Sequence, residues 1–297
     1  MAGAGVFGGH HAKKLAEADG VRLVRIYDAD PVRAASRAEE HGAEGVADLD
    51  AFLPGLDAVV VATPATSHAE IATAALKAGC HVLVEKPLAL TLGDADALIA
   101  LAAARGLVLQ VGHQEVYVVD GLGLLDREGV RHVRSRRLNK PSGRAGDVSV
   151  VMDLMIHDLD LLARLSGSDE AYVTRCEAVG PAGGPADFVA ADLRVGAITA
   201  ELSASRLEDS AVRDLTLATA EGQVGLDFLT RTITNDTGLP LAASMGQGPA
   251  LADPLGHGTR LFLAAIRDGT PRGVTGEEGR AALALALTVE AAAQEVL

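Results

Sequence analysis

Short runs of valine, leucine and isoleucine alternate with amphipathic, alanine-rich segments from Gly3 to about Val111, and this alternation constrains the fold most. The runs have the length of strands, and the segments between them have the length and polar faces of helices. Alternating strands and helices need parallel crossover connections, so we expect a doubly wound parallel α/β sheet. The expected strands are Val21 to Tyr27, Ala58 to Ala62, His81 to Val84 and Leu107 to Val111, and the expected helices are Gly8 to Ala18, Pro31 to His41, Ser67 to Ala78 and Thr91 to Arg105.

The pattern changes after about Val116, where one helix is expected from Met152 to Leu165 and a series of strands follows. Turn residues separate these strands, which indicates antiparallel pairing with one open face. We therefore predict two domains, at residues 1–117 and 118–297, the second an α/β domain with an open, mainly antiparallel sheet. Its expected strands are Tyr172 to Val179, Phe188 to Val195, Ala197 to Arg206, Val212 to Thr219 and Gly225 to Arg231, and the closing helices are about Gly258 to Asp268 and Glu277 to Leu297.

Composition narrows the class of partner. A formal net charge of -14 argues against a nucleic-acid surface, and no apolar run of membrane-spanning length occurs, so we expect neither nucleic acid nor membrane as a partner. Cys80 and Cys176 form no disulfide framework and no metal-ligand spacing, which favours a reducing cytoplasm and a role as buried filler. The basic stretch from Arg131 to Arg137 is predicted to be the exposed face of a strand; the alternative is an anion site for a charged substrate.

Gly3, Gly5 and Gly8 fit the pattern G-x-G-x-x-G, with Val6 and Phe7 inside it. Such glycines permit a tight turn, close approach of the backbone to a pyrophosphate and close packing of helix on strand, as in a Rossmann domain. The alternative is a glycine-rich turn with an ordinary helix cap.

Asp28 ends the next predicted strand, where a carboxylate would accept hydrogen bonds from the adenosine ribose and repel a 2′-phosphate. NAD is therefore favoured over NADP, although Arg33 could pair with such a phosphate.

A central strand should precede Gly3, yet only Met1 and Ala2 do. We interpret this as a start inside a longer coding sequence; the other interpretation is a genuinely shortened strand.

Lys86 follows the strand of Val82 to Val84 within the triplet Glu85-Lys86-Pro87. Side chains at the carboxyl end of a parallel strand project into the ligand crevice, and a lysine there can hold a substrate hydroxyl and favour its alkoxide as hydride leaves. The alternative is a surface lysine before a turn proline.

Asp153, His157 and Asp160 share one face of the predicted helix, whereas Asp158 points elsewhere. Imidazole titrates near neutrality, so His157 suits removal of an alcohol proton, with a carboxylate fixing its tautomer or raising its basicity. The same three side chains could instead ligate a metal or stabilise a surface helix. We favour catalysis and predict no metal.

These motifs in this order, with Thr63, Pro64 and His68 on the intervening loop, resemble the glucose-fructose oxidoreductase, inositol dehydrogenase and rhizopine-catabolism family (Gfo/Idh/MocA). The resemblance implies NAD or NADP, a sugar, cyclitol or nucleotide-sugar substrate, and assembly into a homodimer or homotetramer through the open sheet. The segments Asp147 to Asp153 and Val111 to Glu115 look like the nucleotide-sugar 3-dehydrogenase branch. Inositol or aldose dehydrogenation and a non-catalytic, dinucleotide-dependent sensor remain alternatives.

The resemblance also implies roles for individual residues. Lys86, Asp153 and His157 match the family's catalytic residues, and Asp160, His113 and Arg144 are expected to bind substrate. The residues expected to bind the cofactor are Gly3, Gly5, Val6, Phe7, Gly8, Asp28, Arg33, Thr63, Pro64, His68, Glu85 and Lys86.

Overall fold

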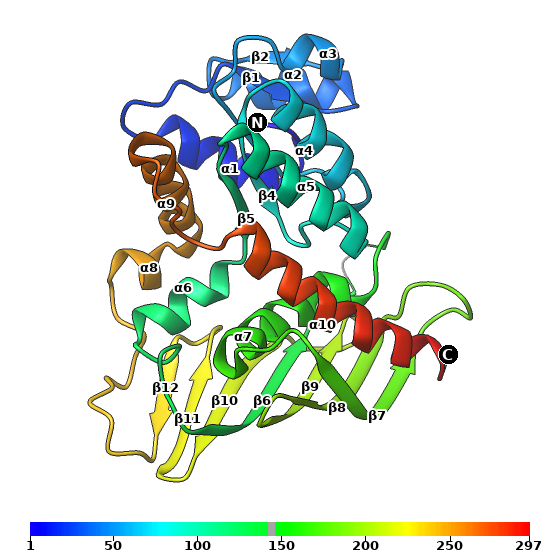
Figure 1. Cartoon of the computed structure of the whole chain (residues 1–297), viewed down its shortest axis with the longest axis vertical. Helices are drawn as coiled ribbons and strands as arrows, with labels where there is room; N and C mark the ends of the chain where they lie inside the picture. The colour runs from blue at the N-terminus through cyan, green and yellow to red at the C-terminus, as the bar shows by residue number, and fades with distance from the viewer. Residues whose placement is uncertain (142–145) are drawn as a thin grey trace. The chain divides into compact units, whose positions relative to one another are not determined.

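The computed structural model describes residues 1–141 and 146–297, which form two compact units (Figure 1). The first unit contains Met1–Gln114 and Asp253–Arg280, and the second contains Glu115–Ala252 and Ala281–Leu297. This division differs from the predicted domains 1–117 and 118–297, because helix α9 (Pro254–Asp268) packs against the N-terminal helix α1 (Val6–Ala16). Sequence order alone did not indicate this return of the chain.

The first unit contains the predicted parallel sheet. Strand β1 (Arg25–Tyr27) pairs with β2 (Glu44–Val46), and β4 (His81–Glu85) lies between β3 (Ala58–Val61) and β5 (Leu109–Gly112), all in parallel. The doubly wound α/β prediction is confirmed. The connecting helices, besides α1, are α2 (Pro31–Glu39), α3 (Leu49–Phe52), the 3₁₀ turn η1 (Ala65–Ser67), α4 (His68–Lys77) and α5 (Leu92–Arg105).

Residues 1–3 occupy the place of the central strand between β1 and β3. Ala2 forms parallel bridges to both Tyr27 and Val61. Gly3 donates its backbone N–H to Tyr27 at 2.7 Å, and the Ala62 N–H donates to Ala2 at 2.8 Å. The strand is therefore short but present, and it joins the two sets of strands into one sheet.

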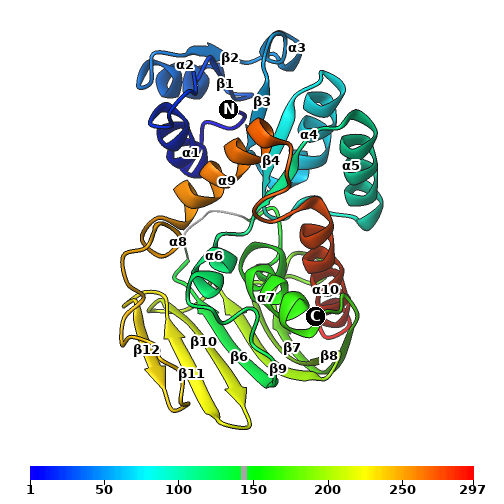
Figure 2. The same cartoon turned by 60° about the vertical axis from the view of Figure 1, so that its left-hand side comes forward.

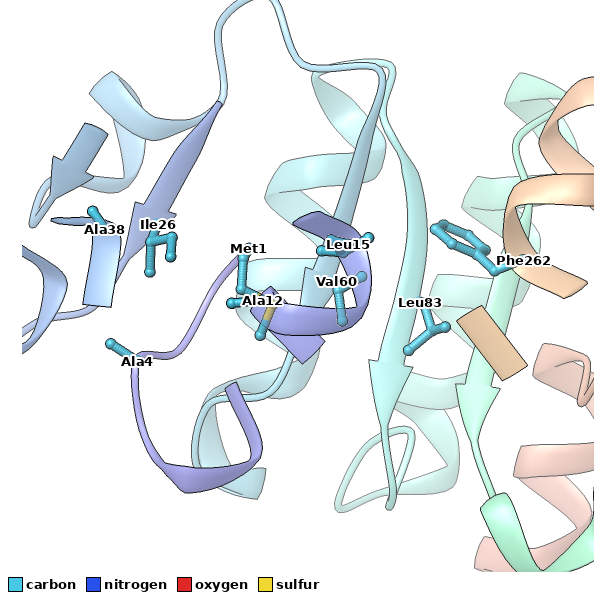
Figure 3. Packing of buried hydrophobic residues seen from close by; sticks show 9 residues of the cluster. All are labelled: Met1, Ala4, Ala12, Leu15, Ile26, Ala38, Val60, Leu83 and Phe262. Carbon is cyan, nitrogen blue, oxygen red and sulfur yellow. The ribbon is translucent and has the colours of Figure 1, made fainter. Parts of the chain in front are cut away.

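The core of the first unit surrounds this short strand (Figure 3). Apolar side chains from the first strand, from α1 and from β1, β3 and β4 pack together, and Phe262 of α9 joins them. Burial of these side chains fixes α1 against the sheet, which positions the glycine loop that precedes it. The clustered residues that Figure 3 labels are Met1, Ala4, Ala12, Leu15, Ile26, Ala38, Val60, Leu83 and Phe262.

The second unit contains a seven-stranded sheet in the order β12-β11-β10-β6-β9-β8-β7. Strands β6 (Val130–Leu138) and β9 (Ile198–Ser205) pair in parallel and the other neighbours are antiparallel, so the mainly antiparallel prediction is confirmed. Figure 2 shows β6 beside β10, although they are far apart in the chain. The remaining strands are β7 (Ala171–Val179), β8 (Phe188–Val195), β10 (Val212–Thr219), β11 (Gly222–Asp227) and β12 (Thr232–Asn235).

Helix α7 (Ile156–Ser166) packs on β6, β8 and β9, and it was predicted to begin at Met152. That boundary was wrong, because a π-helical turn, η2 (Val151–Met155), precedes it. The spacing of 100° per residue therefore does not hold from Asp153 to His157. The other helices are α6 (Gln114–Gly121), α8 (Pro249–Ala252) and α10 (Gly276–Gln294).

The two cysteines and the basic strand depart in part from expectation. Within the described residues both cysteines are free; Cys80 is buried as predicted, but Cys176 is only half-buried. In β6, Arg134 and Arg136 are exposed as predicted, whereas Arg137 is buried. No helix in the described part of the chain is long and apolar enough to span a membrane.

Candidate functional site

The three glycines of the G-x-G-x-x-G loop have different surroundings. A Cβ on Gly3 would stand 2.4 Å from the Ala62 carbonyl oxygen, and φ there is +98°, so this position requires glycine. A Cβ on Gly8 would stand 1.8 Å from the Gly3 carbonyl oxygen, so helix and loop approach too closely for a side chain. In the part of the chain that the structure describes, nothing lies within 4 Å of a Cβ on Gly5. The first and third glycines are thus explained by packing, and the second faces open space.

The N-terminus of α1 beside Gly5 is open to an anion. Gly5 is the N-cap and provides no side-chain cap, and the first turn holds no acidic residue. The first backbone N–H groups of a helix lack partners within it and attract negative charge. A pocket of about 380 Å³ adjoins this terminus, with Val6, Arg33 and Arg37 in its lining. These residues fit the pyrophosphate and adenosine half of a dinucleotide.

Asp28 is held at the end of β1 by three donors. Its Oδ2 accepts a hydrogen bond from the Ala4 backbone N–H at 2.9 Å, and its Oδ1 accepts from the Asp30 N–H at 2.9 Å and from Arg33 at 2.8 Å. Burial would raise the pKa of Asp28, but the hydrogen bonds from Arg33, Asp30 and Ala4 together lower it below its usual value. The group is a carboxylate at neutral pH. Arg33, one of the predicted cofactor residues, is therefore paired with Asp28.

His68 joins the two loops at the carboxyl edge of the sheet. Its Nδ1 lies 2.7 Å from the Pro87 carbonyl oxygen, and its Nε2 lies 3.0 Å from that of Thr63. Burial lowers the pKa of His68, against the opposite effect of these two carbonyl oxygens. Lys86 follows β4 and is half-buried. His68 thus ties the Thr63–Pro64 loop to the loop that carries Lys86.

Glu85 pairs with His11, a residue that the motif analysis did not single out. Glu85 Oε1 lies 2.6 Å from His11 Nε2, and both residues are buried. A Cβ on Gly112 would stand 2.7 Å from Glu85 Oε1, so only glycine on β5 leaves room for this carboxylate. The pair fastens α1 to the end of β4. His113, which follows β5, is also buried.

In the second unit, His157 lies against a carboxylate from another element. His157 Nδ1 is 2.9 Å from Oε2 of Glu115, the second residue of α6. Both side chains retain a small exposed fraction, 13% for His157 and 12% for Glu115. A histidine beside a carboxylate, with part of its ring open to solvent, is arranged to accept a proton.

Arg137 occupies the centre of this cluster. It donates to Asp158 through Nε at 2.7 Å and Nη2 at 2.9 Å, and to Glu115 Oε1 through Nη1 at 2.8 Å. Burial alone would raise the pKa of Glu115, but His157, Arg137 and Arg213 hold it well below its usual value. Glu115 is therefore ionised at neutral pH.

The remaining predicted residues of the second unit have varied surroundings. Asp153 lies in η2 and is half-buried. Asp160 is buried, and its Oδ1 lies 3.1 Å from Arg164 Nε, one helical turn away. Arg144 lies outside the described residues. Among the residues that the structure describes, no group of three His, Cys, Asp or Glu side chains is placed to hold a metal ion.

Glu115, Arg137, Asp158 and His11 were not predicted as site residues. The sequence held clues to two of them. Arg137 stands an even number of residues from the buried Val133 along β6, and alternation places both on one face. For Glu115 the clue was its place just after β5, at the carboxyl end of a parallel strand.

Comparison with known proteins decides the family. Residues 1–113 match the family described as "Oxidoreductase family, NAD-binding Rossmann fold" (GFO_IDH_MocA). The chain is 34% identical to the UDP-N-acetylglucosamine 3-dehydrogenase of Acidithiobacillus ferrooxidans, over 99% of this chain and 96% of that protein. The chain belongs to the Gfo/Idh/MocA family. The resemblance stated from its motifs is confirmed, and this family member is an oxidoreductase with an NAD-binding Rossmann fold.

Further relatives support the fold and the family. The solved structure of the Acidithiobacillus ferrooxidans enzyme superposes with a TM-score of 0.87 at 33% identity, covering 99% of this chain and 97% of that one. GenD2 from gentamicin A biosynthesis, solved in complex with NAD, has a TM-score of 0.84 over 98% of this chain and 92% of its own; its 24% identity shows the fold alone. Inositol 2-dehydrogenase 1 of Saccharopolyspora erythraea is 40% identical over 38% of this chain and 35% of its own length.

Proposed function

We propose that this family member transfers hydride reversibly between NAD and a ring hydroxyl of a nucleotide sugar. The observation that carries the proposal is the half-buried imidazole of His157 beside the Glu115 carboxylate, in a chain similar over its whole length to a UDP-N-acetylglucosamine 3-dehydrogenase. We expect a UDP-linked amino sugar as substrate and its C3 hydroxyl as the reacting group.

NAD is the proposed cofactor because of Asp28. This carboxylate stays ionised, and it stands next to the open N-terminus of α1. A second negative charge on the ribose would be repelled by it. The Arg33 guanidinium forms ion pairs with Asp28 and Asp30, so fewer of its N–H groups are available to bind a 2′-phosphate.

Each residue of the catalytic set has a proposed task. Bound NAD⁺ would supply the hydride acceptor for the carbon that carries the hydroxyl. His157 takes the hydroxyl proton, and the Lys86 ammonium donates a hydrogen bond to the same oxygen. Asp153 belongs to the catalytic set with His157 and Lys86, and Asp160 binds the substrate together with His113 and Arg144. Thr63 and Pro64 would hold the nicotinamide half of the cofactor. Alcohol and NAD⁺ thus give carbonyl, NADH and one proton.

We also propose assembly into a homodimer or homotetramer through the open face of the seven-stranded sheet. On this face the exposed Arg134, Arg136 and Glu201 present both signs of charge, which suits pairing with a second copy of the same face. Light scattering at micromolar concentration should give a multiple of the monomer mass, and a monomer would refute this part of the proposal.

The test of the proposed function is NADH formation by the purified protein. UDP-N-acetylglucosamine should give NADH with NAD⁺, whereas myo-inositol and free aldoses should not. Lys86→Met and His157→Gln should each lower kcat by about a hundredfold or more while NAD⁺ binding persists. Absence of turnover across a broad panel, by protein that binds NAD⁺, would favour a cofactor-dependent sensor.

A further inference from the structure

We propose that Glu115 is the positioning residue of His157: its carboxylate holds the imidazole at Nδ1 and leaves Nε2 to take the proton from the substrate. The inference rests on the proposed function, since it gives His157 the same task. It adds a residue from a different element, α6, to the Asp153 and His157 pair that the motif defines.

The contact between Glu115 and His157 favours one tautomer. Nδ1 stands 2.9 Å from Glu115 Oε2, and a carboxylate at that distance favours a proton on Nδ1 over a lone pair there. Neutral imidazole carries one N–H, so a proton on Nδ1 leaves the Nε2 lone pair as the base. When Nε2 gains the substrate's proton, the new imidazolium lies against the Glu115 charge, as in hydrolases that pair histidine with a carboxylate.

Arg137 fixes Glu115 in the orientation that this contact needs. Its guanidinium is 2% exposed and is anchored on Asp158 by two hydrogen bonds. Its remaining Nη1 holds Glu115 Oε1 at 2.8 Å, which turns Oε2 toward His157. Glu115 lies on α6, Arg137 on β6 and Asp158 on α7. The positions of these three charged side chains therefore depend on packed helices and a strand rather than on one loop.

The charges around His157 are nearly balanced before the reaction. Glu115 and Asp158 are negative, and they face Arg137 of β6 and, at 3.8 Å from Glu115, Arg213 of β10. On the helix of His157 itself, Asp160 is paired with Arg164. A protonated His157 thus meets the Glu115 carboxylate as its direct counter-charge. Burial raises the pKa of Glu115, but Arg137 and Arg213 help to hold it well below its usual value, so Glu115 is ionised when His157 gains its proton.

The test compares Glu115→Gln with Glu201→Gln by NMR titration of the histidine rings. Glutamine keeps the shape and an acceptor oxygen but removes the charge. Glu201 is the matched control because its Oε1 lies 3.8 Å from His132 Nε2 on β6. Glu115→Gln should lower the pKa of His157 by about one pH unit and leave His132 unchanged. Glu201→Gln should leave His157 unchanged. The His157→Gln variant assigns the signal.

Kinetics with UDP-N-acetylglucosamine and NAD⁺ give the second readout. In Glu115→Gln, the acidic limb of the kcat/KM profile should move about one unit toward lower pH, and kcat at the plateau should fall about tenfold, with NAD⁺ binding unchanged. Asp158→Asn keeps the Glu115 charge beside His157 and loosens only the Arg137 anchor, so it should move that limb less than Glu115→Gln does. If Glu115 had only a structural role, Glu115→Gln and Asp158→Asn would both be less stable than wild type, and neither would shift the acidic limb of the kcat/KM profile.

Different failures give different results. An unchanged His157 titration in Glu115→Gln overturns the inference, and so does a wild-type ring whose neutral tautomer carries its proton on Nε2. The tautomer is read from the wild-type protein, so this test stands even if Glu115→Gln does not fold. If the titration moves as expected but no substrate is turned over, the Glu115–His157 pairing stands and the proposed function fails.

Discussion

The glycine loop offers a matched pair of substitutions, Gly5→Ala and Gly8→Ala, that separates cofactor binding from folding. Both add one methyl group to the same turn. A Cβ on Gly8 would stand 1.8 Å from the Gly3 carbonyl oxygen, whereas nothing in the described structure lies within 4 Å of a Cβ on Gly5. We expect Gly8→Ala to destabilise the protein without cofactor, and Gly5→Ala to weaken NAD⁺ binding alone.

The magnitudes follow from these distances. Removing the overlap at Gly8 requires the loop or α1 to shift by more than an ångström, which costs about 3 kcal/mol and lowers Tm by on the order of 10 °C. At Gly5 the backbone angles, φ -69° and ψ -168°, are open to alanine, so Tm should change by about 2 °C or less. The methyl group would keep a pyrophosphate from the first N–H groups of α1. Loss of one such charge-assisted hydrogen bond costs about 1.5–3 kcal/mol, or roughly ten- to hundredfold in Kd.

Thermal unfolding without cofactor and calorimetric titration with NAD⁺ measure the two effects separately. Wild-type protein and both variants are compared in the same buffer. If Gly5→Ala binds NAD⁺ as tightly as wild type, the loop does not hold the pyrophosphate. If Gly8→Ala melts with wild type, close packing does not explain the third glycine.

Three further outcomes are expected. Asp28→Ser should weaken NAD⁺ binding about tenfold and reduce the protein's preference for NAD⁺ over NADP⁺. The substitution removes a charged hydrogen-bond acceptor and releases Arg33 from its ion pair. Equilibrium binding of both cofactors measures the two effects. The pKa of Glu115 is lowered in the folded protein, so Glu115 adds stability that is present above its ordinary value of 4.5 and is lost as pH falls below that value. Tm of Glu115→Gln should therefore change less than that of wild type over this acid range, and parallel curves would contradict the assignment. His11→Ala should cost about 1–3 kcal/mol, and the double variant with Glu85→Gln should cost less than the sum of the single changes, as measured by chemical denaturation.

The sequence pattern predicted the fold well where the spacing of apolar residues within a segment indicated its secondary structure. Alternating apolar runs and amphipathic helices gave the parallel sheet, and turn residues gave the antiparallel one. The pattern failed where tertiary contacts decided. It missed β2 and β12, whose ladders depend on neighbours distant in sequence, and it extended α7 across the π turn that holds Asp153.

The predicted site residues were those with a position in a motif. Lys86, Asp28 and His157 stand at strand ends or on a helix where spacing alone indicates chemistry. Glu115 and Arg137 have no such spacing. They lie 22 residues apart in sequence, and they meet beside α7, where Glu115 contacts His157 and Arg137 contacts Asp158.

The sequence by itself determined the parallel sheet and the glycine loop, and it indicated candidate acid and base groups, because these depend on residues close together in the chain. Only the tertiary structure decided that α9 joins the first unit, that Ala2 bridges β1 and β3, and that Arg137 is buried. Each of these outcomes is a contact between segments far apart in sequence. Such contacts depend on the burial of apolar surface and on the pairing of buried charges. Neither of these requires a fixed spacing of residues along the chain, so no local pattern predicts them.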